Sequence, residues 1–344
     1  MPIRSIELSE FSAFEHVELR CVAGLNVFIG ENGTGKSHAL KAVYSLLEAM
    51  RVSRQPAGPK LLQAVESKLA GVFRPTGGAV TRLIRRKHGQ NAAELSIVSD
   101  KGTAFRAGIS VRGMTVRRPW GPFQSVFLPT REVLALFPGF VSLYDNREIS
   151  FDETYRDACL AVGLPGLRGV RRTTAEALAS SLRKALGGRT ELKADGFYVK
   201  FDGDRAFMEA HLVAEGLRKI ATLERLVVNG TLTKNGYLFW DEPEANLNPK
   251  LTTVIADVLC GLADSGVQVF LATHDYLLLK QLDLQAARKQ APPTRFFAFH
   301  RPRTGAPVEI EHADRLDLLS HNPIADEFIR LYERKLAADE EDAP

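Results

Sequence analysis

Gly30-Glu31-Asn32-Gly33-Thr34-Gly35-Lys36-Ser37 is the stretch of this sequence that decides the fold. It has the form G-x-x-x-x-G-K-[ST], in which glycines allow the backbone to wrap around a phosphate with its N–H groups pointing inward. The apolar run 25–29 before it has the composition of a buried strand, and the segment 38–47 after it has apolar residues at helical spacing. The order of strand, glycine-rich loop and helix predicts a P-loop.

The loop predicts a nucleotide site. Lys36 is expected to reach the β- and γ-phosphates, and the hydroxyl of Ser37 is expected to bind Mg²⁺. A chance match in a turn is the alternative, expected in roughly one chain in a hundred of this length, and the flanking strand and helix disfavour it. The residues expected to hold the nucleotide through this loop are Asn32, Gly33, Thr34, Gly35, Lys36, Ser37 and His38.

Acidic residues follow a second apolar run. The segment 237–240 leads directly into Asp241 and Glu242. An acid at the carboxyl end of a parallel strand faces the nucleotide crevice of an α/β sheet, so Asp241 is expected to hold Mg²⁺. Glu242 would orient or deprotonate the water that attacks the γ-phosphate. The alternative is a cluster of helix-capping acids after a core strand, which the P-loop upstream disfavours.

A third apolar run, 267–272, ends at Thr273-His274-Asp275. A histidine at the end of a neighbouring core strand can hydrogen-bond a γ-phosphate, although a lone histidine is more often a surface or capping residue. The sequence therefore predicts three catalytic residues, Lys36, Glu242 and His274, with Ser37 and Asp241 as metal ligands.

Length and composition predict a globular protein of the cytoplasm. The chain has 344 residues, 45% hydrophobic and 25% charged, with a net charge of +4, which is too mild to indicate nucleic-acid binding by itself. Three widely spaced cysteines predict no disulfide framework and no zinc cluster. There is no secretory signal pattern and no apolar run of membrane-spanning length, so we expect no membrane partner.

Residue patterns divide the chain into four segments. We expect the N-terminal part of the nucleotide-binding lobe at 1–130, with a small antiparallel sheet, and its C-terminal part at 205–337. An inserted, mostly helical lobe is expected at 131–204, and a frayed acidic tail at 338–344. Segments 191–201 and 206–213 are expected to form a hairpin around Gly203. No sustained apolar heptads occur, which excludes a long coiled coil.

These motifs together resemble an ABC-type P-loop ATPase of the SMC, RecF and OLD group. The N-terminal segment through Ser37 is similar to that group, and the run Asp241 to Pro249 resembles its OLD-like branch, closest to the stand-alone ATPases without a TOPRIM domain. His274 matches the switch histidine and 246–249 the D-loop, and the similarity covers about 1–50 and 205–280. The resemblance implies an α/β fold with a mixed sheet core, a small antiparallel β subdomain and an inserted helical lobe.

Two motifs of the family depart from its pattern. A Ser-Gly-Gly-like signature contacts the γ-phosphate of the opposite subunit in this family, and here its place is taken by Ala214-Glu215-Gly216. Since Ala214 lacks the hydroxyl, the contact would depend on Gly216, backbone amides, and Arg218 or Lys219. The alternative is an ordinary helix start. Where transporters carry a phosphate-sensing glutamine this chain has Arg131 and Glu132. We expect Arg131 or Glu132 to contact the nucleotide there, and we take Arg131 as the site residue.

The resemblance implies Mg²⁺-dependent ATP hydrolysis in a homodimer closed around ATP. The residues after His274 are too few for a TOPRIM domain, so we expect a separate effector protein, by analogy in bacterial defence against phage. The alternative is a DNA-acting ATPase of the RecF kind, and a third possibility, an ATP binder without turnover, is disfavoured by Glu242 and His274. The basic and aromatic residues that would contact DNA are Arg82, Arg85, Arg86, Lys87, Arg112, Arg117, Arg118, Arg168, Arg171, Arg172, Trp120 and Phe123.

Overall fold

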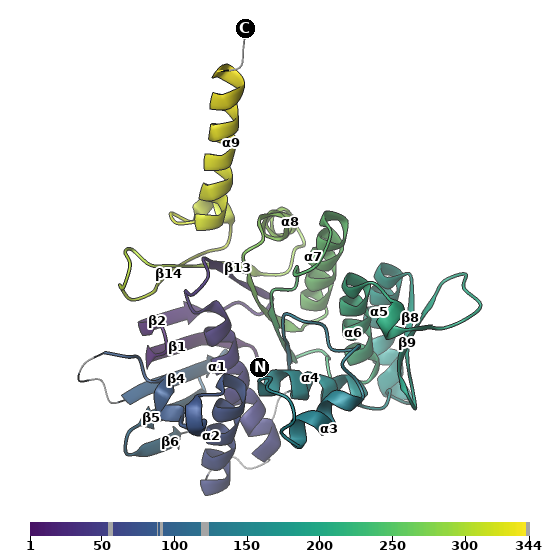
Figure 1. The fold of residues 1–344 in the computed structure, drawn as a ribbon, viewed down its shortest axis with the longest axis horizontal. Helices are drawn as coiled ribbons and strands as arrows, with labels where there is room; N and C mark the ends of the chain where they lie inside the picture. Colours follow the sequence, from purple (N-terminus) through teal and green to yellow (C-terminus); the bar gives the residue numbers. More distant parts are fainter. Residues whose placement is uncertain (54–57, 88, 90–91, 118–123, 342–344) are drawn as a thin grey trace.

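A computed structural model describes residues 1–53, 58–87, 89, 92–117 and 124–341, without the side chains of 170–174, 336, 340 and 341. Its largest sheet has six strands, of which five are parallel and only β14 is antiparallel to its neighbour (Figure 1). In spatial order the strands are β14 (Glu309–Ala313), β13 (Thr294–His300), β3 (Leu25–Gly30), β12 (Gln268–Thr273), β11 (Tyr237–Asp241) and β7 (Ser125–Leu128).

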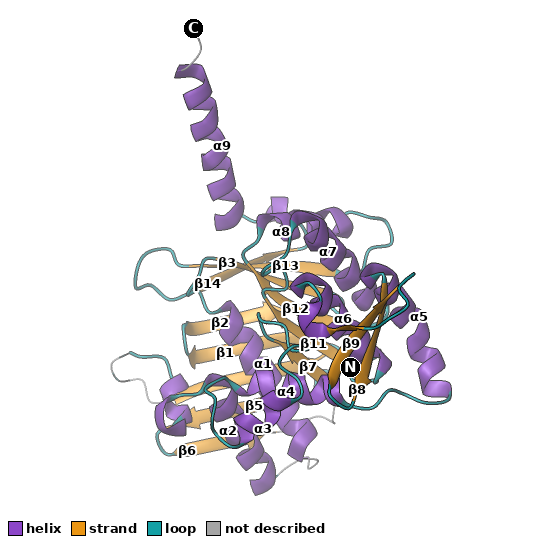
Figure 2. Cartoon of the chain, turned by 45° about the vertical axis from the view of Figure 1, so that its right-hand side comes forward, coloured by secondary structure: helices purple, strands orange, loops and turns teal. Residues whose placement is uncertain are grey.

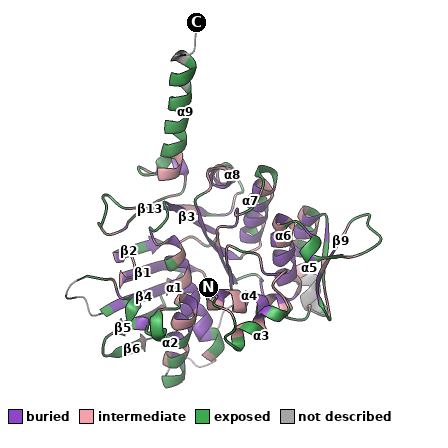
Figure 3. Cartoon of the chain, viewed as in Figure 1, coloured by how far each residue is buried: buried purple, intermediate pink, exposed green. Residues whose placement is uncertain are grey.

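Both faces of this sheet are buried, which is why its strands are continuous apolar runs (Figure 3). Because successive side chains point to opposite faces, the strands divide their residues between two cores. Leu238 and Trp240 of β11 face one core, which is mainly aliphatic, and Phe239 faces the other. In that second core Phe239 stacks on Phe270, with ring centroids 5.1 Å apart.

The aromatic core is covered by a second sheet and two helices. This sheet is antiparallel. Its strands in spatial order are β2 (Phe14–Arg20), β1 (Ile3–Phe11), β4 (Ala92–Ser99), β5 (Ala104–Ser110) and β6 (Gly113–Arg117). Helix α2 (Pro59–Phe73) packs on strand β6 and on helix α1 (Lys36–Ser53), and α1 lies against the six-stranded sheet (Figure 2). The short 3₁₀ helices η1 (Thr76–Gly78) and η2 (Val80–Leu83) lead into β4. The mixed sheet with a small antiparallel sheet confirms the predicted fold class.

The aliphatic core is covered by three helices on the opposite face, α6 (Glu215–Val228), α7 (Pro249–Asp264) and α8 (Tyr276–Ala286). Helix α7 begins as its sequence predicts, since Asn248 caps it by accepting from the Leu251 amide at 2.9 Å and Pro249 occupies the first turn. Helix α8 is capped in the same way by Asp275. Both helices therefore start just after functional motifs.

The segment predicted as a helical lobe contains a small sheet as well. It holds α3 (Gly139–Asp145), α4 (Glu153–Gly163), α5 (Val170–Leu186), β8 (Gly188–Lys193) and β9 (Gly196–Phe201), with β10 (Met208–Glu209) and η3 (Ala210–Leu212) beyond it. The expectation of one strand over 191–201 is wrong, because the chain turns at Ala194 and Asp195 and pairs Lys193 with Gly196. The Asp-Gly pair in that stretch is a hairpin signal.

The C-terminal helix α9 (Pro323–Glu341) projects from the body, with η4 (Leu316–Leu318) before it (Figure 1). The expectation of a frayed tail from 338 is wrong as far as Glu341, since the helix continues to that residue. At its base Phe328 stacks on Tyr276, with ring centroids 4.2 Å apart. Residues 342–344 of the predicted tail lie outside the described residues.

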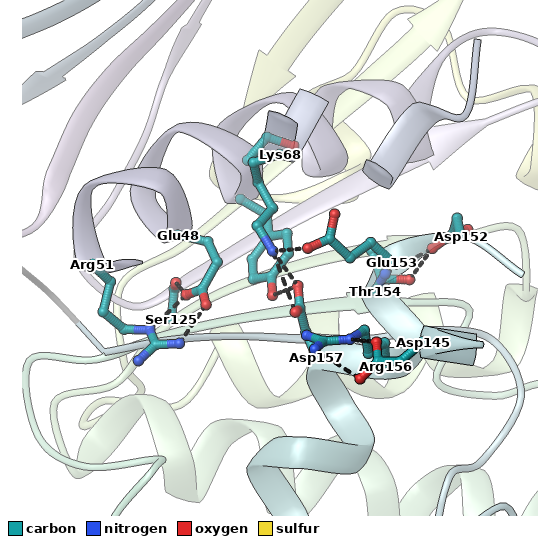
Figure 4. Close-up of polar contacts among 12 residues, drawn as sticks. Glu48, Arg51, Lys68, Ser125, Asp145, Asp152, Glu153, Thr154, Arg156 and Asp157 are labelled. Carbon is teal, nitrogen blue, oxygen red and sulfur yellow. Dashed lines mark hydrogen bonds and ion pairs between the residues drawn. The ribbon is translucent and has the colours of Figure 1, made fainter. Parts of the chain in front are cut away.

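A buried polar network joins the P-loop helix α1 and helix α2 to α4 (Figure 4). The Tyr44 hydroxyl donates to Asp157 at 2.7 Å, and Lys68 binds Asp157 at 3.0 Å and Glu153 at 2.5 Å. Lys41, one turn along α1 from the P-loop, binds Asp152 at 2.8 Å. The helix that begins at the P-loop is therefore tied to the inserted segment by charged contacts rather than by apolar packing alone.

This network predicts a pH-dependent stability. Burial is the main cause that raises the pKa of Asp157 from 3.8 to about 6, and Lys68 opposes it. Because the folded pKa lies above the unfolded one, Asp157 contributes stability that is complete below about pH 4 and is lost as pH rises through 6, up to about 3 kcal/mol. Between pH 4 and 7 the unfolding free energy of the wild type should therefore fall more steeply than that of Asp157→Asn.

Chemical denaturation across that pH range checks the difference. Asp204→Asn, an exposed aspartate outside the network, is the matched control and should follow the wild type. Parallel profiles for the wild type and Asp157→Asn would contradict the assignment of the titration to Asp157.

Candidate functional site

The P-loop takes the conformation that its glycines allow. Gly33 and Gly35 have φ of 79° and 93°, in the left-handed region that side chains disfavour. A Cβ atom on Gly35 would also lie 2.7 Å from the ring of Phe14, and one on Gly30 would lie 2.2 Å from the carbonyl oxygen of Phe299. These three positions therefore require glycine, and the loop lies close against β2 and β13.

Lys36 folds back over its own loop. Its Nζ donates to the carbonyl oxygens of Gly30 at 2.7 Å and Glu31 at 2.9 Å, and the residue is 7% exposed. Burial lowers the pKa of Lys36, and the carboxylates of Asp241 and Glu242 oppose the shift. In this structure the Lys36 ammonium donates to loop carbonyls, and in a nucleotide complex it would donate to phosphate oxygens instead. The ammonium group therefore already points into the phosphate cradle, the space enclosed by the P-loop 30–37.

The two predicted metal ligands are in contact. The Ser37 hydroxyl donates to Oδ1 of Asp241 at 2.8 Å, across from the start of α1 to the end of β11. Burial raises the pKa of Asp241, and the hydrogen bond from Ser37 opposes this. The described residues contain no group of three or more His, Cys, Asp or Glu side chains that could hold a metal alone. A hydroxyl and a carboxylate suit Mg²⁺, which usually takes its remaining ligands from water and phosphate.

Glu242 and His274 also meet. Nδ1 of His274 lies 3.3 Å from Oε1 of Glu242, and both side chains are partly exposed, at 49% and 32%. Glu242 has φ of 50°, a left-handed conformation that is rare outside glycine. Its amide donates to Ala272 at 2.9 Å, which holds this turn against β12. Strained backbone of this kind occurs where a side chain must be aimed, as functional sites require.

The remaining P-loop residues differ in exposure. Asn32 and Gly33 are exposed, whereas Thr34 is buried and donates to the Glu31 carbonyl at 2.8 Å. The side chain of His38 is turned toward the antiparallel sheet, where its Nδ1 bonds the Ser12 hydroxyl and its ring lies 5.4 Å from that of Phe73. Only the backbone of His38 is therefore directed at the cradle through the first turn of α1.

The signature candidate lies at the start of α6, with Ala214 as its N-cap residue and no side-chain cap. Oε1 of Glu215 accepts from the side-chain Nδ2 of Asn246 at 3.1 Å, which joins the helix to the D-loop of the same chain. A Cβ on Gly216 would meet Leu247 and Leu251 at 2.7 Å. Close packing therefore explains this glycine within one chain, and the contact to a second chain stays a prediction.

The cations proposed to assist the signature have partners in their own chain. Arg218 binds Glu132 at 2.7 Å and donates to the Val213 carbonyl at 2.6 Å, while Lys219 donates to the carbonyls of Pro243 and Ala245. Glu132 additionally accepts from the Leu134 amide at 2.9 Å. Neither cation is free in this conformation. Arg131 follows β7 and has an exposed side chain, so its assignment to the nucleotide stays a prediction.

Sequence reasoning missed Glu244. It is buried at 8% exposure, and its Oε1 accepts from the Thr273 hydroxyl at 2.6 Å and from the His274 amide at 3.3 Å. Arg301, after β13, is a second residue missed, with Nη2 3.4 Å from the Gly33 carbonyl oxygen. Each lies just beyond the carboxyl end of a strand of the six-stranded sheet, and this position was the available signal.

Comparisons with known proteins indicate what the chain is similar to in sequence and in fold. Residues 145–280 match the family model described as "AAA domain, putative AbiEii toxin, Type IV TA system". The DNA replication and repair protein RecF of Streptococcus suis strain 05ZYH33 is 34% identical over 82 residues, 23% of this chain and 22% of RecF. RecF of Streptococcus pyogenes serotype M1 is 32% identical over 102 residues, 30% and 25% of the two chains. The matches thus span about a quarter of these relatives or less.

Solved structures share the fold over nearly the whole chain. A Smc head bound to the C-winged helix domain of ScpA has a TM-score of 0.54 at 14% identity, covering 91% of this chain and 98% of that one. The SMC head domain from Thermotoga maritima has a TM-score of 0.50 at 12% identity, with coverage of 91% and 99%. Identity this low shows the fold alone. Among the described helices, none is long and apolar enough to cross a membrane.

Proposed function

We propose that this chain, whose fold and nucleotide motifs are those of an ABC-type P-loop ATPase, couples Mg²⁺-dependent ATP hydrolysis to the assembly of two chains. The observation that carries the proposal is the convergence of Lys36, Ser37, Asp241, Glu242 and His274 at the carboxyl ends of β3, β11 and β12. This edge is where ligands bind in open α/β sheets.

Each residue has a part that follows from its chemistry. Lys36 would exchange its loop carbonyls for phosphate oxygens and hold negative charge on the transferred group. Glu242 would accept a hydrogen bond or a proton from the attacking water. His274, at 3.3 Å from Glu242, would orient that carboxylate and donate to the γ-phosphate. Together these groups support in-line attack of water.

Ser37 and Asp241 are the residues that would hold Mg²⁺, since their oxygens lie 2.8 Å apart and both suit this cation. When bound with ATP, Mg²⁺ neutralises charge on the β- and γ-phosphate oxygens.

Substitution of Ser37 tests the metal site. Ser37→Ala removes one oxygen donor and also frees Asp241, so the Mg²⁺ concentration for half-maximal turnover should rise by about 10-fold and turnover at saturating Mg²⁺ should fall by a similar factor. Titration of ATPase activity with MgCl₂ measures both. Ser45→Ala on the same helix is the matched control, because its hydroxyl only bonds the Lys41 carbonyl. An unchanged Mg²⁺ requirement in Ser37→Ala would contradict the assignment.

The second chain is proposed to supply the signature in trans. Ala214, Glu215 and Gly216 begin α6, whose N-terminus offers backbone amides to an anion. Two chains related by a two-fold axis would each bind ATP between the P-loop of one and the signature of the other. Binding would then favour the dimer, and hydrolysis would release it.

We propose as biological role the regulation of a separately encoded effector in bacterial anti-phage defence, with the chain as an OLD-like ATPase. The run Asp241 to Pro249 supports the OLD-like assignment, and the matched family model, whose description names a putative toxin of a type IV toxin–antitoxin system, supports a connection to a toxin-type effector.

The second candidate is a DNA-acting ATPase, which the RecF matches favour. The basic residues only partly support it. Arg85 binds Glu10 and Glu15, and Lys87 binds Glu15, whereas Arg82, Arg86, Arg112 and Arg117 have no ion pair within the described residues. Arg118, Trp120 and Phe123, and the side chains of Arg171 and Arg172, lie outside the described residues.

ATP turnover with and without duplex DNA separates the two roles. Turnover that is indifferent to DNA supports the effector role, and copurified proteins then identify the partner. Several-fold stimulation that is lost at high salt supports the DNA-acting role, because phosphate contacts release counterions. Double substitution Arg82→Ala/Arg86→Ala should then reduce the stimulation, whereas Lys184→Ala on the exposed face of α5 should not.

A further inference from the structure

We infer that Glu244 is a positioning residue that holds His274 against Glu242 and connects both to the start of α6. The inference rests on the proposed ATP hydrolysis. Oε1 of Glu244 accepts from the Thr273 hydroxyl at 2.6 Å and from the His274 amide at 3.3 Å. Because His274 follows β12 directly, these two bonds fix the backbone from which its imidazole reaches Glu242.

The same residue is anchored on its other side by Lys219. The Lys219 ammonium donates to the carbonyls on either side of Glu244, to Pro243 at 3.2 Å and to Ala245 at 2.7 Å. Lys219 is only 2% exposed; burial lowers the pKa of its ammonium group, and the negative charges of Glu215 and Glu244 oppose the shift. A buried cation on α6 and a buried anion on the turn 243–245 thus hold one short segment between them.

The contacts form a continuous path between two parts of the site. It runs from Lys219 on α6 to the turn 243–245, then through Glu244 to Thr273 and the His274 backbone. His274 completes it with the contact to Glu242 at 3.3 Å, one residue before the turn begins. A displacement of the α6 start, where a second chain's ATP is proposed to bind, would therefore move the pair that acts on water.

The two carboxylate oxygens of Glu244 differ in their hydrogen bonds, and this difference supports a role beyond folding. Oε2 of Glu244 is buried without a hydrogen-bond partner among the described residues, although burial of an unpaired polar atom is unfavourable. Thr273 is also fully buried, and its hydroxyl accepts from the Asp275 amide at 3.0 Å while donating to Glu244. An apolar pair would fill this space without an unpaired oxygen.

Thr273→Val and Glu244→Gln test the inference in the full chain. Thr273→Val keeps the side-chain shape and removes the donor, and Glu244→Gln keeps the length and removes the charge. We expect each to lower kcat for ATP by about 10-fold with KM changed less than about 2-fold, because the contacts act on the water-activating pair and not on the phosphate cradle. The double variant should be little worse than either single one, since both break one path. Thr273→Ser should retain kcat.

Two matched control variants show whether a buried Thr→Val or Glu→Gln substitution lowers kcat wherever it is made. Thr294→Val removes a buried hydroxyl at the opposite end of the sheet, and Glu224→Gln neutralises a buried glutamate that binds Arg183. Neither should change kcat by more than about 2-fold. A spectroscopic readout without nucleotide accompanies the kinetics. The NMR ring signal of His274, identified by its loss in His274→Ala, should shift in Thr273→Val and Glu244→Gln, and it should shift in Glu242→Gln as well.

The outcomes separate this inference from the proposed function. If the wild type turns over ATP and the two variants keep its kcat, the inference is overturned and the proposed hydrolysis stands. An increase in KM as large as the decrease in kcat would also overturn the inference, because the residues would then act on ATP binding. A His274 signal that does not shift would overturn it too, because the residues would then act only on folding. If the wild type releases no more phosphate than Glu242→Gln, both the hydrolysis and the positioning role fail.

Discussion

Glutamine in place of Glu242 is expected to lower ATP turnover by about 10²–10⁴-fold while ATP binding is retained. The amide has nearly the size of the carboxylate, but it cannot accept a proton from water, and removal of a general base typically has this effect. Contacts of the phosphate cradle are untouched, because Lys36 and Ser37 do not depend on Glu242 for their hydrogen bonds. The dissociation constant for ATP should therefore stay within about 2-fold of the wild type.

A consequence for assembly follows from the same variant. If hydrolysis separates the two chains, Glu242→Gln with MgATP should accumulate as a dimer, whereas the wild type should return to the monomer as ATP is consumed. Phosphate release and analytical ultracentrifugation measure the two effects, and Glu66→Gln on the exposed face of α2 is the control. Undiminished turnover in Glu242→Gln would exclude this residue as the base.

Alanine in place of Lys36 is expected to abolish turnover, by at least about 100-fold, and to weaken ATP binding to a similar degree. The ammonium group is buried in the loop and would form charge-assisted hydrogen bonds to phosphate in a site shielded from water. Truncation of one partner in such a pair typically costs about 2–5 kcal/mol.

The fold should tolerate Lys36→Ala. Among the described residues, Nζ of Lys36 bonds only two carbonyls of its own loop, so the thermal midpoint without ATP should change little. Calorimetric ATP titration and thermal unfolding separate binding from folding, with Lys184→Ala as the control. ATP affinity equal to that of the wild type would show that the loop does not hold the phosphates.

The central site could be predicted because its residues follow apolar strand runs directly. Parallel strands meet at one edge, so the ends of 25–29, 237–240 and 267–272 indicated that Ser37, Asp241, Glu242 and His274 would be neighbours. The structure brings Ser37 to Asp241 and His274 to Glu242. The mixed sheet and the antiparallel sheet were predictable for the same reason, since their periodicities differ.

Contacts between distant segments could not be predicted. Lys219 is twenty-four residues from Pro243 in sequence, and only the packing of α6 beside the turn reveals that it holds that segment. From the sequence we expected the Arg218 side chain to be available to a phosphate, but in the structure it forms an ion pair with Glu132, which is distant in sequence. In the sequence Glu244 is one more acidic residue after the strand. Its burial and its hydrogen bond from Thr273 depend on the tertiary structure, so they could not be predicted.

In two places the structure differs from what the local sequence pattern predicted. The turn at Ala194 and Asp195 divides what the alternating pattern predicted as one strand into β8 and β9. At the C-terminus acidic composition predicted fraying, but helix α9 continues to Glu341 because its residues have good helix propensity and contain no breaker. Composition is a weaker guide there than propensity.

Phosphate release from MgATP, measured per chain over a range of protein concentrations, tests the central claim most directly. The account predicts that the wild type releases phosphate well above Glu242→Gln from the same preparation. It also predicts that the rate per chain rises with protein concentration toward a plateau, because each site needs a second chain. Wild-type release no greater than that of Glu242→Gln at every concentration would contradict the account.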